Sequence, residues 1–81
     1  MACIYVIENK LLGKLYTGSS RENEPSVRIT AHNTGKVQST KSGIPWKLVH
    51  AEMYNNYADA RKRELFLKSG RGRELLKQIL S

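Results

Sequence analysis

Residues 3–18, CIYVIENKLLGKLYTG, contain two short apolar runs, and each run carries a tyrosine. Tyr5 and Tyr16 lie 16 − 5 = 11 positions apart. The segment between the runs, residues 9–13, ends in a glycine and suits the turn of a β-hairpin. We therefore predict two paired strands with one tyrosine in each. A strand tyrosine most often packs its ring and leaves its hydroxyl at the wet edge, so packing alone would account for both.

Further along the chain, the pattern alternates between helical and extended periods. Pro25 suits the first turn of a helix, and Gly35 suits a left-handed position just past its end. Asn56 followed by Asp59 resembles the N-terminal box of another helix, which Gly70 is expected to end. The predicted elements are strands over residues 2–8, 14–18 and 46–54, and helices over residues 24–34, 57–69 and 72–80.

This order, β-β-α-β-α-α, predicts an α+β fold with a three-stranded mixed or antiparallel sheet and flanking helices. A chain of 81 residues has room for one compact core, so residues 1–81 are expected to form a single domain.

Two segments also predict which side chains share a face. In the third strand, Val49, Ala51 and Met53 are expected on one face of the sheet. In the helix after Asn56, the apolar arc includes Leu65, and Glu64 falls inside the same arc. A carboxylate that points toward a sheet needs a partner.

The charge balance is strongly basic. The chain has 14 Lys and Arg against 7 Asp and Glu, which gives a net charge of +7 and a pI near 9.9. So much positive charge on a small surface favours polyanions, with nucleic acid as the leading partner over an ordinary basic surface. Residues 35–45 are a polar loop that suits either phosphate contacts or a solvated connection. The predicted nucleic-acid contacts are Lys14, Arg28, Lys36, Lys41, Arg71 and Arg73.

Cysteine content and hydropathy point to a reducing compartment. Cys3 is the only cysteine, which excludes an intramolecular disulfide and a cysteine-based zinc site. No apolar run approaches the ~18 residues of a membrane span. The N-terminus also lacks the basic start and long apolar stretch of a signal peptide. We expect a cytoplasmic location and no membrane partner.

Three polar residues could join the tyrosines in a site, although each also has an ordinary role. Arg28 and His32 are spaced i,i+4, which places them on one helix face. Arg28 alone suits a surface charge, and His32 alone suits the C-terminal end of a helix dipole. Glu64 can pair with Arg61 or Lys68 on its own helix.

The sequence resembles the GIY-YIG nucleases, which are named for two short motifs in a hairpin. Those motifs correspond here to residues 3–5, CIY, and residues 16–18, YTG, and Arg28, His32 and Glu64 follow in the family's order. The segments HNTGK and STKSGIPWKLV resemble the small single-domain bacterial members. Cys3 replaces a glycine and Thr17 an isoleucine, changes that a strand tolerates. A late asparagine of some members has no counterpart after Glu64.

The resemblance implies a catalytic set of Tyr5, Tyr16, Arg28, His32 and Glu64. Glu64 would hold one divalent ion, Mg²⁺ or Mn²⁺. Arg28 would clamp the phosphate, and His32 would bind substrate or assist proton transfer. One tyrosine would act as base or position the attacking water, and the other would contact the scissile phosphate. Tyr5 is the slightly preferred candidate for the base.

The resulting functional prediction is metal-dependent, endonuclease-type hydrolysis of DNA phosphodiester bonds. The substrate is expected to be branched, single-stranded or distorted DNA, in repair, recombination or mobile-element biology. Sequence specificity is expected to be low or supplied by a protein partner, because so small a chain buries little surface on DNA. The alternative is a non-catalytic, basic nucleic-acid-binding module of the same fold. A small RNA-associated protein is a third reading that rests on charge alone.

Overall fold

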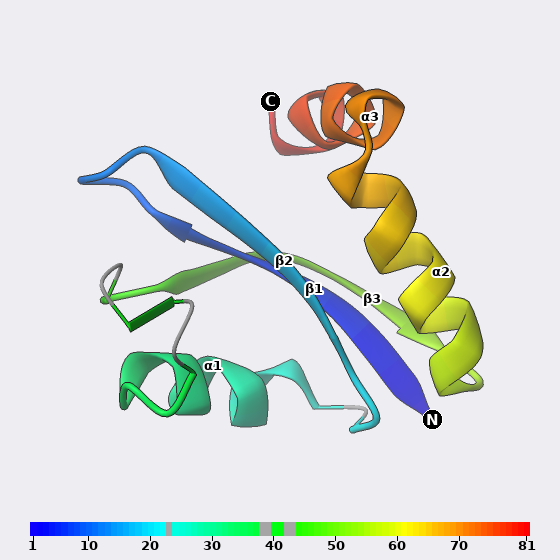
Figure 1. Cartoon of the computed structure of the whole chain (residues 1–81), viewed down its shortest axis with the longest axis horizontal. Helices are drawn as coiled ribbons and strands as arrows, with labels where there is room; N and C mark the ends of the chain where they lie inside the picture. Colours follow the sequence, from blue (N-terminus) through cyan, green and yellow to red (C-terminus); the bar gives the residue numbers. More distant parts are fainter. Residues whose placement is uncertain (23, 38–39, 42–43) are drawn as a thin grey trace.

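A computed structural model of the chain describes residues 1–22, 24–37, 40–41 and 44–81. It confirms the predicted α+β class and the order β-β-α-β-α-α (Figure 1). The elements are β1 (Ala2–Asn9), β2 (Lys14–Ser20), α1 (Pro25–Asn33), β3 (Lys47–Tyr54), α2 (Tyr57–Lys68) and α3 (Gly70–Leu80). Within the described ranges, no helix is long and apolar enough to cross a membrane.

The sheet has three strands in the order β2-β1-β3, and both pairings are antiparallel. Helix α1 covers one face, whereas α2 and α3 lie on the other (Figure 1). The core is accordingly split into two clusters. On the α2 side, Ile4 and Val6 of β1 pack with Leu67. On the α1 side, Tyr5 and Ile7 pack with residues that include Trp46 and Ile29.

The hairpin forms where the tyrosine-bearing runs predict it. Gly13 has a φ of 65°, a left-handed conformation that glycine adopts without strain. The Asn9 side chain accepts a hydrogen bond from the backbone N–H of Leu12 at 3.0 Å, which supports the turn. Strand β2 continues to Ser20, beyond the predicted end at residue 18, because Ser20 still pairs with Cys3.

The predicted faces of the third strand are wrong in part. A register shift between Val6 and Ile7 leaves Val49 without a partner on β1. Val49 therefore packs into the α2-side core, while Ala51 pairs with Tyr5 on the α1 side. A bulge of this kind moves one residue to the other face, which the alternation of apolar residues does not reveal.

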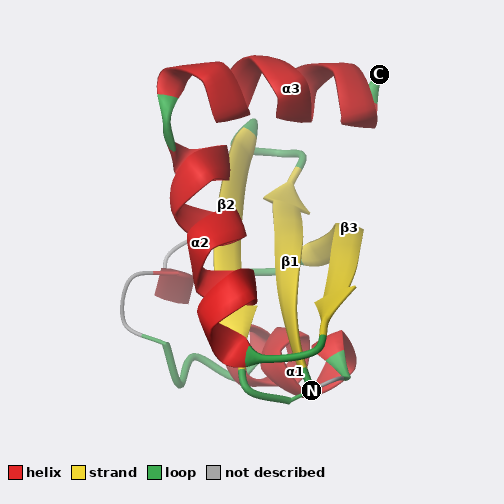
Figure 2. Cartoon of the chain, turned by 90° about the vertical axis from the view of Figure 1, so that its right-hand side faces the viewer, coloured by secondary structure: helices red, strands yellow, loops and turns green. Residues whose placement is uncertain are grey.

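The last two helices confirm one predicted boundary and correct another. Asn56 caps α2, and its side-chain oxygen accepts from the N–H of Asp59 at 2.9 Å, as the box predicts. Gly70, however, is the first residue of α3, and the break between the helices falls at Ser69. Figure 2 shows α3 lying across the end of α2 and the adjacent ends of β1 and β2. Leu65 is 54% exposed, so its assignment to the apolar arc is wrong.

Candidate active site

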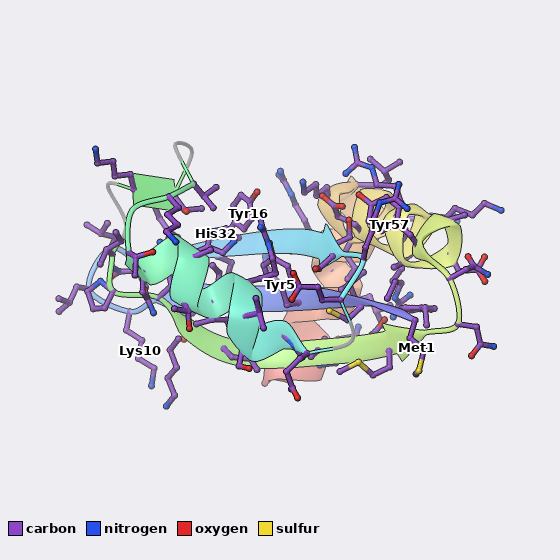
Figure 3. All side chains as sticks on the ribbon, turned by 90° about the horizontal axis from the view of Figure 1, so that it is seen from below. Met1, Tyr5, Lys10, Tyr16, His32 and Tyr57 are labelled. Atoms are coloured by element: carbon purple, nitrogen blue, oxygen red, sulfur yellow. The ribbon has the colours of Figure 1, made fainter. Side chains whose placement is uncertain are left out.

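A chain of hydrogen bonds connects the first-motif tyrosine to the histidine of α1. The Tyr5 hydroxyl lies 2.9 Å from Nε2 of His32, and the two rings meet edge to face. On the other side of the imidazole, Nδ1 lies 2.6 Å from the Thr40 hydroxyl. Tyr5, His32 and Thr40 are each at most 1% exposed. Figure 3 shows Tyr5 and His32 together between α1 and the sheet.

The segment after α1 is fastened so that Thr40 faces His32. Asn33, the last residue of α1, accepts from the backbone N–H of Trp46 at 2.6 Å and donates to its carbonyl at 3.0 Å. The Trp46 indole N–H in turn donates to the carbonyl of Thr40 at 2.8 Å. The buried tryptophan thus fixes the backbone that carries the Thr40 hydroxyl.

The surroundings keep His32 neutral. Burial lowers its pKa below the ordinary value of 6.5, and the positive charge of Arg28 lowers it further. The Thr40 hydroxyl can donate to the carbonyl of Val37, 3.4 Å away. Nδ1 then carries the ring proton toward Thr40, and Nε2 is left as an acceptor for the Tyr5 hydroxyl.

The two motif tyrosines differ in what their hydroxyls can reach. Burial raises the pKa of Tyr5, although a hydrogen bond from Arg28 and its charge act against that rise. The Tyr5 hydroxyl therefore stays protonated near neutral pH and donates a hydrogen bond to His32. Tyr16 is only half-buried; its ring lies 5.1 Å from that of His32 and 6.5 Å from that of Trp46. Within the described residues its hydroxyl has no hydrogen-bond partner, so it is free to meet a ligand.

Arg28 has a donor that the described residues do not use. Its Nε is buried and has no hydrogen-bond partner among them. A buried, charged donor without a partner is costly, and an anion supplied from outside would satisfy it. Arg28 also influences the pKa of both Tyr5 and His32, which places the guanidinium beside that pair.

Glu64 is buried, as its place in the apolar arc predicts, and its carboxylate accepts hydrogen bonds from three side chains. It is 4% exposed. Lys68 donates to Oε2 at 2.6 Å, while Arg61 at 2.7 Å and the Ser19 hydroxyl both donate to Oε1. Burial alone would raise the pKa of Glu64, but the hydrogen bonds from Lys68, Ser19 and Arg61 outweigh it and lower the pKa. The carboxylate is thus ionised, and both pairings predicted from helix spacing are present.

The carboxylate and the tyrosine–histidine group approach edge strand β2 from opposite faces of the sheet. Ser19 pairs with Ile4 on the α2 side, whereas Tyr16 pairs with Ile7 on the α1 side. Lys68 reaches both, because its ammonium bonds Glu64 and lies 5.7 Å from the centroid of the Tyr16 ring. Residues from both faces therefore meet around the exposed edge of β2.

The oxygen atoms at Glu64 are of the kind that ligates a hard divalent cation. Among the described residues there is no group of three or more His, Cys, Asp or Glu that could hold a metal. Mg²⁺ needs no such group, since it keeps several waters and takes one or two carboxylates together with substrate phosphate. Glu64 supplies the carboxylate, with the hydroxyls of Ser19 and Tyr57 beside it. Lys68 and Arg61 already bond the two carboxylate oxygens, so their positive charges oppose a cation at Glu64.

The predicted nucleic-acid contacts fall into two groups. Arg28, Lys36 and Lys41 belong to α1 and the segment after it, whereas Lys14, Arg71 and Arg73 lie at the start of β2 and on α3. The predicted phosphate-contacting loop, residues 35–45, includes positions 38–39 and 42–43, which lie outside the described residues. Arg73 lines a cavity together with Tyr16.

Sequence reasoning did not identify several residues that complete the site. They are Ser19, Thr40, Trp46 and Tyr57. Ser19 follows directly on the second motif, at a position whose side chain must point away from the face of Gly18. That alternation was the available signal. Thr40 had none, since it is one of several hydroxyl residues in a polar loop.

Comparison with known proteins assigns the chain to a family. Residues 1–77 match the GIY-YIG catalytic domain, so the chain belongs to the GIY-YIG family, whose fold is of the nuclease type. It is 38% identical over 77 residues to a UPF0213 protein of Staphylococcus saprophyticus, which covers 94% of this chain and 90% of the relative. A UPF0213 protein of Streptococcus agalactiae is 35% identical over 68 residues, covering 83% and 74%. No solved structure matches the chain significantly.

Proposed function

We propose that this protein is a divalent-metal-dependent endonuclease that hydrolyses DNA phosphodiester bonds. The observation that carries the proposal is the buried Nε of Arg28, which has no hydrogen-bond partner among the described residues and belongs to a guanidinium beside the Tyr5–His32 pair. A phosphate is the ligand that this charged donor requires. The membership of the family supports the reaction class, and the net charge of +7 supports a polyanionic substrate.

The roles of the two tyrosines follow from their exposure. Tyr16 is half-buried, and its hydroxyl has no hydrogen-bond partner in the described part of the chain, so it contacts the attacking water or the scissile phosphate. Tyr5 is too deeply buried for that contact. It instead orients His32, whose Nε2 accepts a hydrogen bond from the Tyr5 hydroxyl. This differs from the preference for Tyr5 that the sequence alone suggests. Arg28 stabilises the charge that develops on the phosphate oxygens.

Glu64 is the proposed ligand of Mg²⁺ or Mn²⁺. When bound, such an ion supplies Lewis acidity to the phosphate and lowers the pKa of a coordinated water. Ser19 holds the carboxylate in place through its hydroxyl. Lys68, released from Glu64, is long enough to turn toward a phosphate at the edge of β2.

The proposed substrate is branched, single-stranded or distorted DNA that is cut with low sequence specificity. Duplex recognition by base reading requires an element that enters a groove over a large interface, and a chain with overall extents of 30 × 26 × 18 Å offers little surface for it. A partner protein would supply any further specificity. Repair, recombination and mobile-element biology are the settings in which such substrates arise.

A non-catalytic nucleic-acid-binding module is the second candidate, and one observation favours it. Both oxygens of Glu64 are already occupied by cations of the chain itself, so the carboxylate does not repel a phosphate as a free charge would. A binder could therefore retain Glu64 as a structural residue. The two candidates differ in their need for a divalent ion.

The test is nicking of supercoiled and branched DNA with Mg²⁺ or Mn²⁺ by the wild type and by Glu64→Gln. The matched control is Glu74→Gln, which removes an exposed carboxylate of α3. We expect the wild type and Glu74→Gln to nick in the presence of the ion, and Glu64→Gln to lose at least 100-fold in rate. Equal background activity in all three proteins, together with tight binding that needs no divalent ion, would establish the binding module instead.

A further inference from the structure

A cavity of about 420 Å³ lies where β2, the end of α2 and α3 meet. Figure 2 shows these three elements converging beside the edge of the sheet. Its volume falls within the ~300–1,000 Å³ range of small-molecule and cofactor sites. Neither the proposed metal ligand nor the Tyr5–His32 pair lines this cavity, so it calls for a separate explanation.

The cavity combines an apolar floor with a basic rim. Leu67 and Leu76, both nearly buried, form the floor, and Leu15 forms a wall that is 45% exposed. The rim carries three cations, Lys68, Arg73 and Lys77. A ligand that matches this lining has a weakly polar body attached to negative charge.

The rim is available to an anion. Arg73 has no carboxylate partner within the described part of the chain. Lys77 has only a loose pairing with Glu74, 3.9 Å apart, between two side chains that are both about three-quarters exposed. An exposed pair of this kind contributes little and is readily exchanged for a phosphate.

The cavity is continuous with the proposed active site. Tyr16 and Lys68 line it, and Lys68 also bonds the proposed metal ligand Glu64. A strand of nucleic acid whose phosphate lies beside Tyr16 and Lys68 therefore has its next nucleotide at the mouth of the cavity.

We propose that this cavity binds the base of an unpaired nucleotide next to the cleaved phosphate, with Arg73 and Lys77 on the flanking phosphates. The proposal rests on the function proposed above and gives it a substrate class, single-stranded or locally unpaired DNA. A base within a duplex is stacked and paired, so entry would cost a few kcal/mol of unstacking that an unpaired base does not require. Leucine side chains carry no hydrogen-bond donors or acceptors that could read a base edge, so they give little sequence preference.

The test measures binding without catalysis, so that its outcome is independent of nuclease activity. Fluorescence anisotropy in EDTA compares a labelled single-stranded oligothymidylate, the same oligonucleotide carrying abasic residues, and a duplex of equal length. The wild-type sequence serves as the protein background throughout, because EDTA withholds the divalent ion that cleavage would need. We expect the base-bearing single strand to bind about 5- to 100-fold more tightly than the abasic one, and more tightly than the duplex.

Protein variants assign that difference to the cavity. Leu15→Thr keeps a strand-forming residue at the wall and should reduce the preference for bases at least threefold. Leu11→Thr, at a residue of the hairpin turn that is 91% exposed, is the matched control and should leave it unchanged. Arg73→Gln should weaken the binding of the base-bearing and abasic strands equally, since Arg73 is proposed to contact phosphate, which both strands carry.

Three results would overturn the proposal. The first is equal affinity of the wild-type chain for base-bearing and abasic strands, which does not depend on any variant folding. The second is an equal effect of Leu15→Thr and Leu11→Thr. The third is conversion of a dimer to a monomer by Leu15→Thr in sedimentation, which would make the cavity a contact between copies of the chain. Base-dependent binding together with no nicking by the wild type would instead contradict only the catalytic proposal.

Discussion

The ring of Tyr5 lies directly over Gly18, its partner on the neighbouring strand. A side-chain carbon at Gly18 would overlap the Tyr5 hydroxyl and the ring carbon that bears it, and would lie 3.0 Å from the next ring carbon. The last residue of the second motif is therefore a glycine because the tyrosine of the first motif occupies its side-chain space. The two motifs are complementary parts of one packing arrangement that aims Tyr5 at His32.

Gly18→Ala should consequently damage both the fold and the site. The added methyl group must push Tyr5 away from His32, and we expect a loss of about 1–3 kcal/mol in the free energy of unfolding, as overpacking commonly gives. Nicking activity should fall at least tenfold. Gly70→Ala is the control, since in the described part of the chain no atom beyond its own neighbours and helix backbone lies within 4 Å of a side-chain carbon there. Denaturant unfolding measures the first effect; a Gly18→Ala protein as stable and active as Gly70→Ala would contradict the packing argument.

The protonation state of His32 predicts a pH profile. Its pKa is lowered, so the folded protein keeps the ring neutral while an unfolded histidine begins to bind a proton near pH 6.5. Stability that depends on the neutral ring is thus complete above about pH 6.5 and declines as the pH falls below it. We expect nicking to persist through pH 6.5 and to fall only in more acidic solution. NMR titration of the His32 ring checks this, and an inflection at or above 6.5 would contradict it.

Arg28 should act on turnover more than on binding. If its guanidinium stabilises charge that develops on the phosphate, Arg28→Ala lowers the maximal rate by about 100-fold or more and weakens DNA binding by a much smaller factor. Lys36→Ala, an exposed cation just beyond α1, is the control for general charge loss. Single-turnover kinetics measure the maximal rate separately from the affinity for DNA. A pure loss of affinity, equal to that of Lys36→Ala, would argue against the proposed clamp.

Periodicity in the sequence predicts the elements because most of them bury one face, and the exceptions have identifiable causes. Glu64 could be predicted as buried from its place in the helical arc, and its two partners from their i+4 and i−3 spacing. Val49 could not be assigned to its face, because the bulge depends on how β3 pairs with β1. The position of Gly70 at the start of α3 could not be predicted either, because a glycine at this place usually ends a helix. Here Ser69 caps α3, so a new helix begins directly at Gly70.

Edge strand β3 is joined to α2 by a hydrogen-bond network around Glu52, and this network should control the stability of the protein in acid. Glu52 accepts two hydrogen bonds from Arg63, at 2.9 and 3.2 Å, and one from the Tyr54 hydroxyl at 2.6 Å. Burial would raise the pKa of Glu52, but the hydrogen bonds from Arg63, His50 and Tyr54 lower it to about 2. The stabilisation is therefore complete above about pH 4.5 and is lost as the pH falls toward 2.

Glu52→Gln should remove this dependence. We expect it to cost on the order of 2 kcal/mol of unfolding free energy at pH 7 and to flatten the decline in stability between pH 4.5 and 2. Glu8→Gln, a carboxylate outside the network, is the control that should keep the wild-type slope. Urea unfolding at several pH values measures both. Parallel curves for the wild type and Glu52→Gln would show that the network does not set acid stability.

Lys68 competes with the proposed ion for the same carboxylate, which predicts an increase in affinity on its removal. Lys68 Nζ lies 2.6 Å from Oε2 of Glu64, so its positive charge opposes a divalent ion on that oxygen. Lys68→Met keeps the length of the side chain and removes the charge; we expect Mn²⁺ to bind about 3- to 10-fold more tightly. Lys62→Met, on the same helix and exposed, is the control. Water-proton relaxation by Mn²⁺ measures the affinity without DNA. Unchanged or weaker binding by Lys68→Met relative to Lys62→Met would place the ion elsewhere than on Glu64.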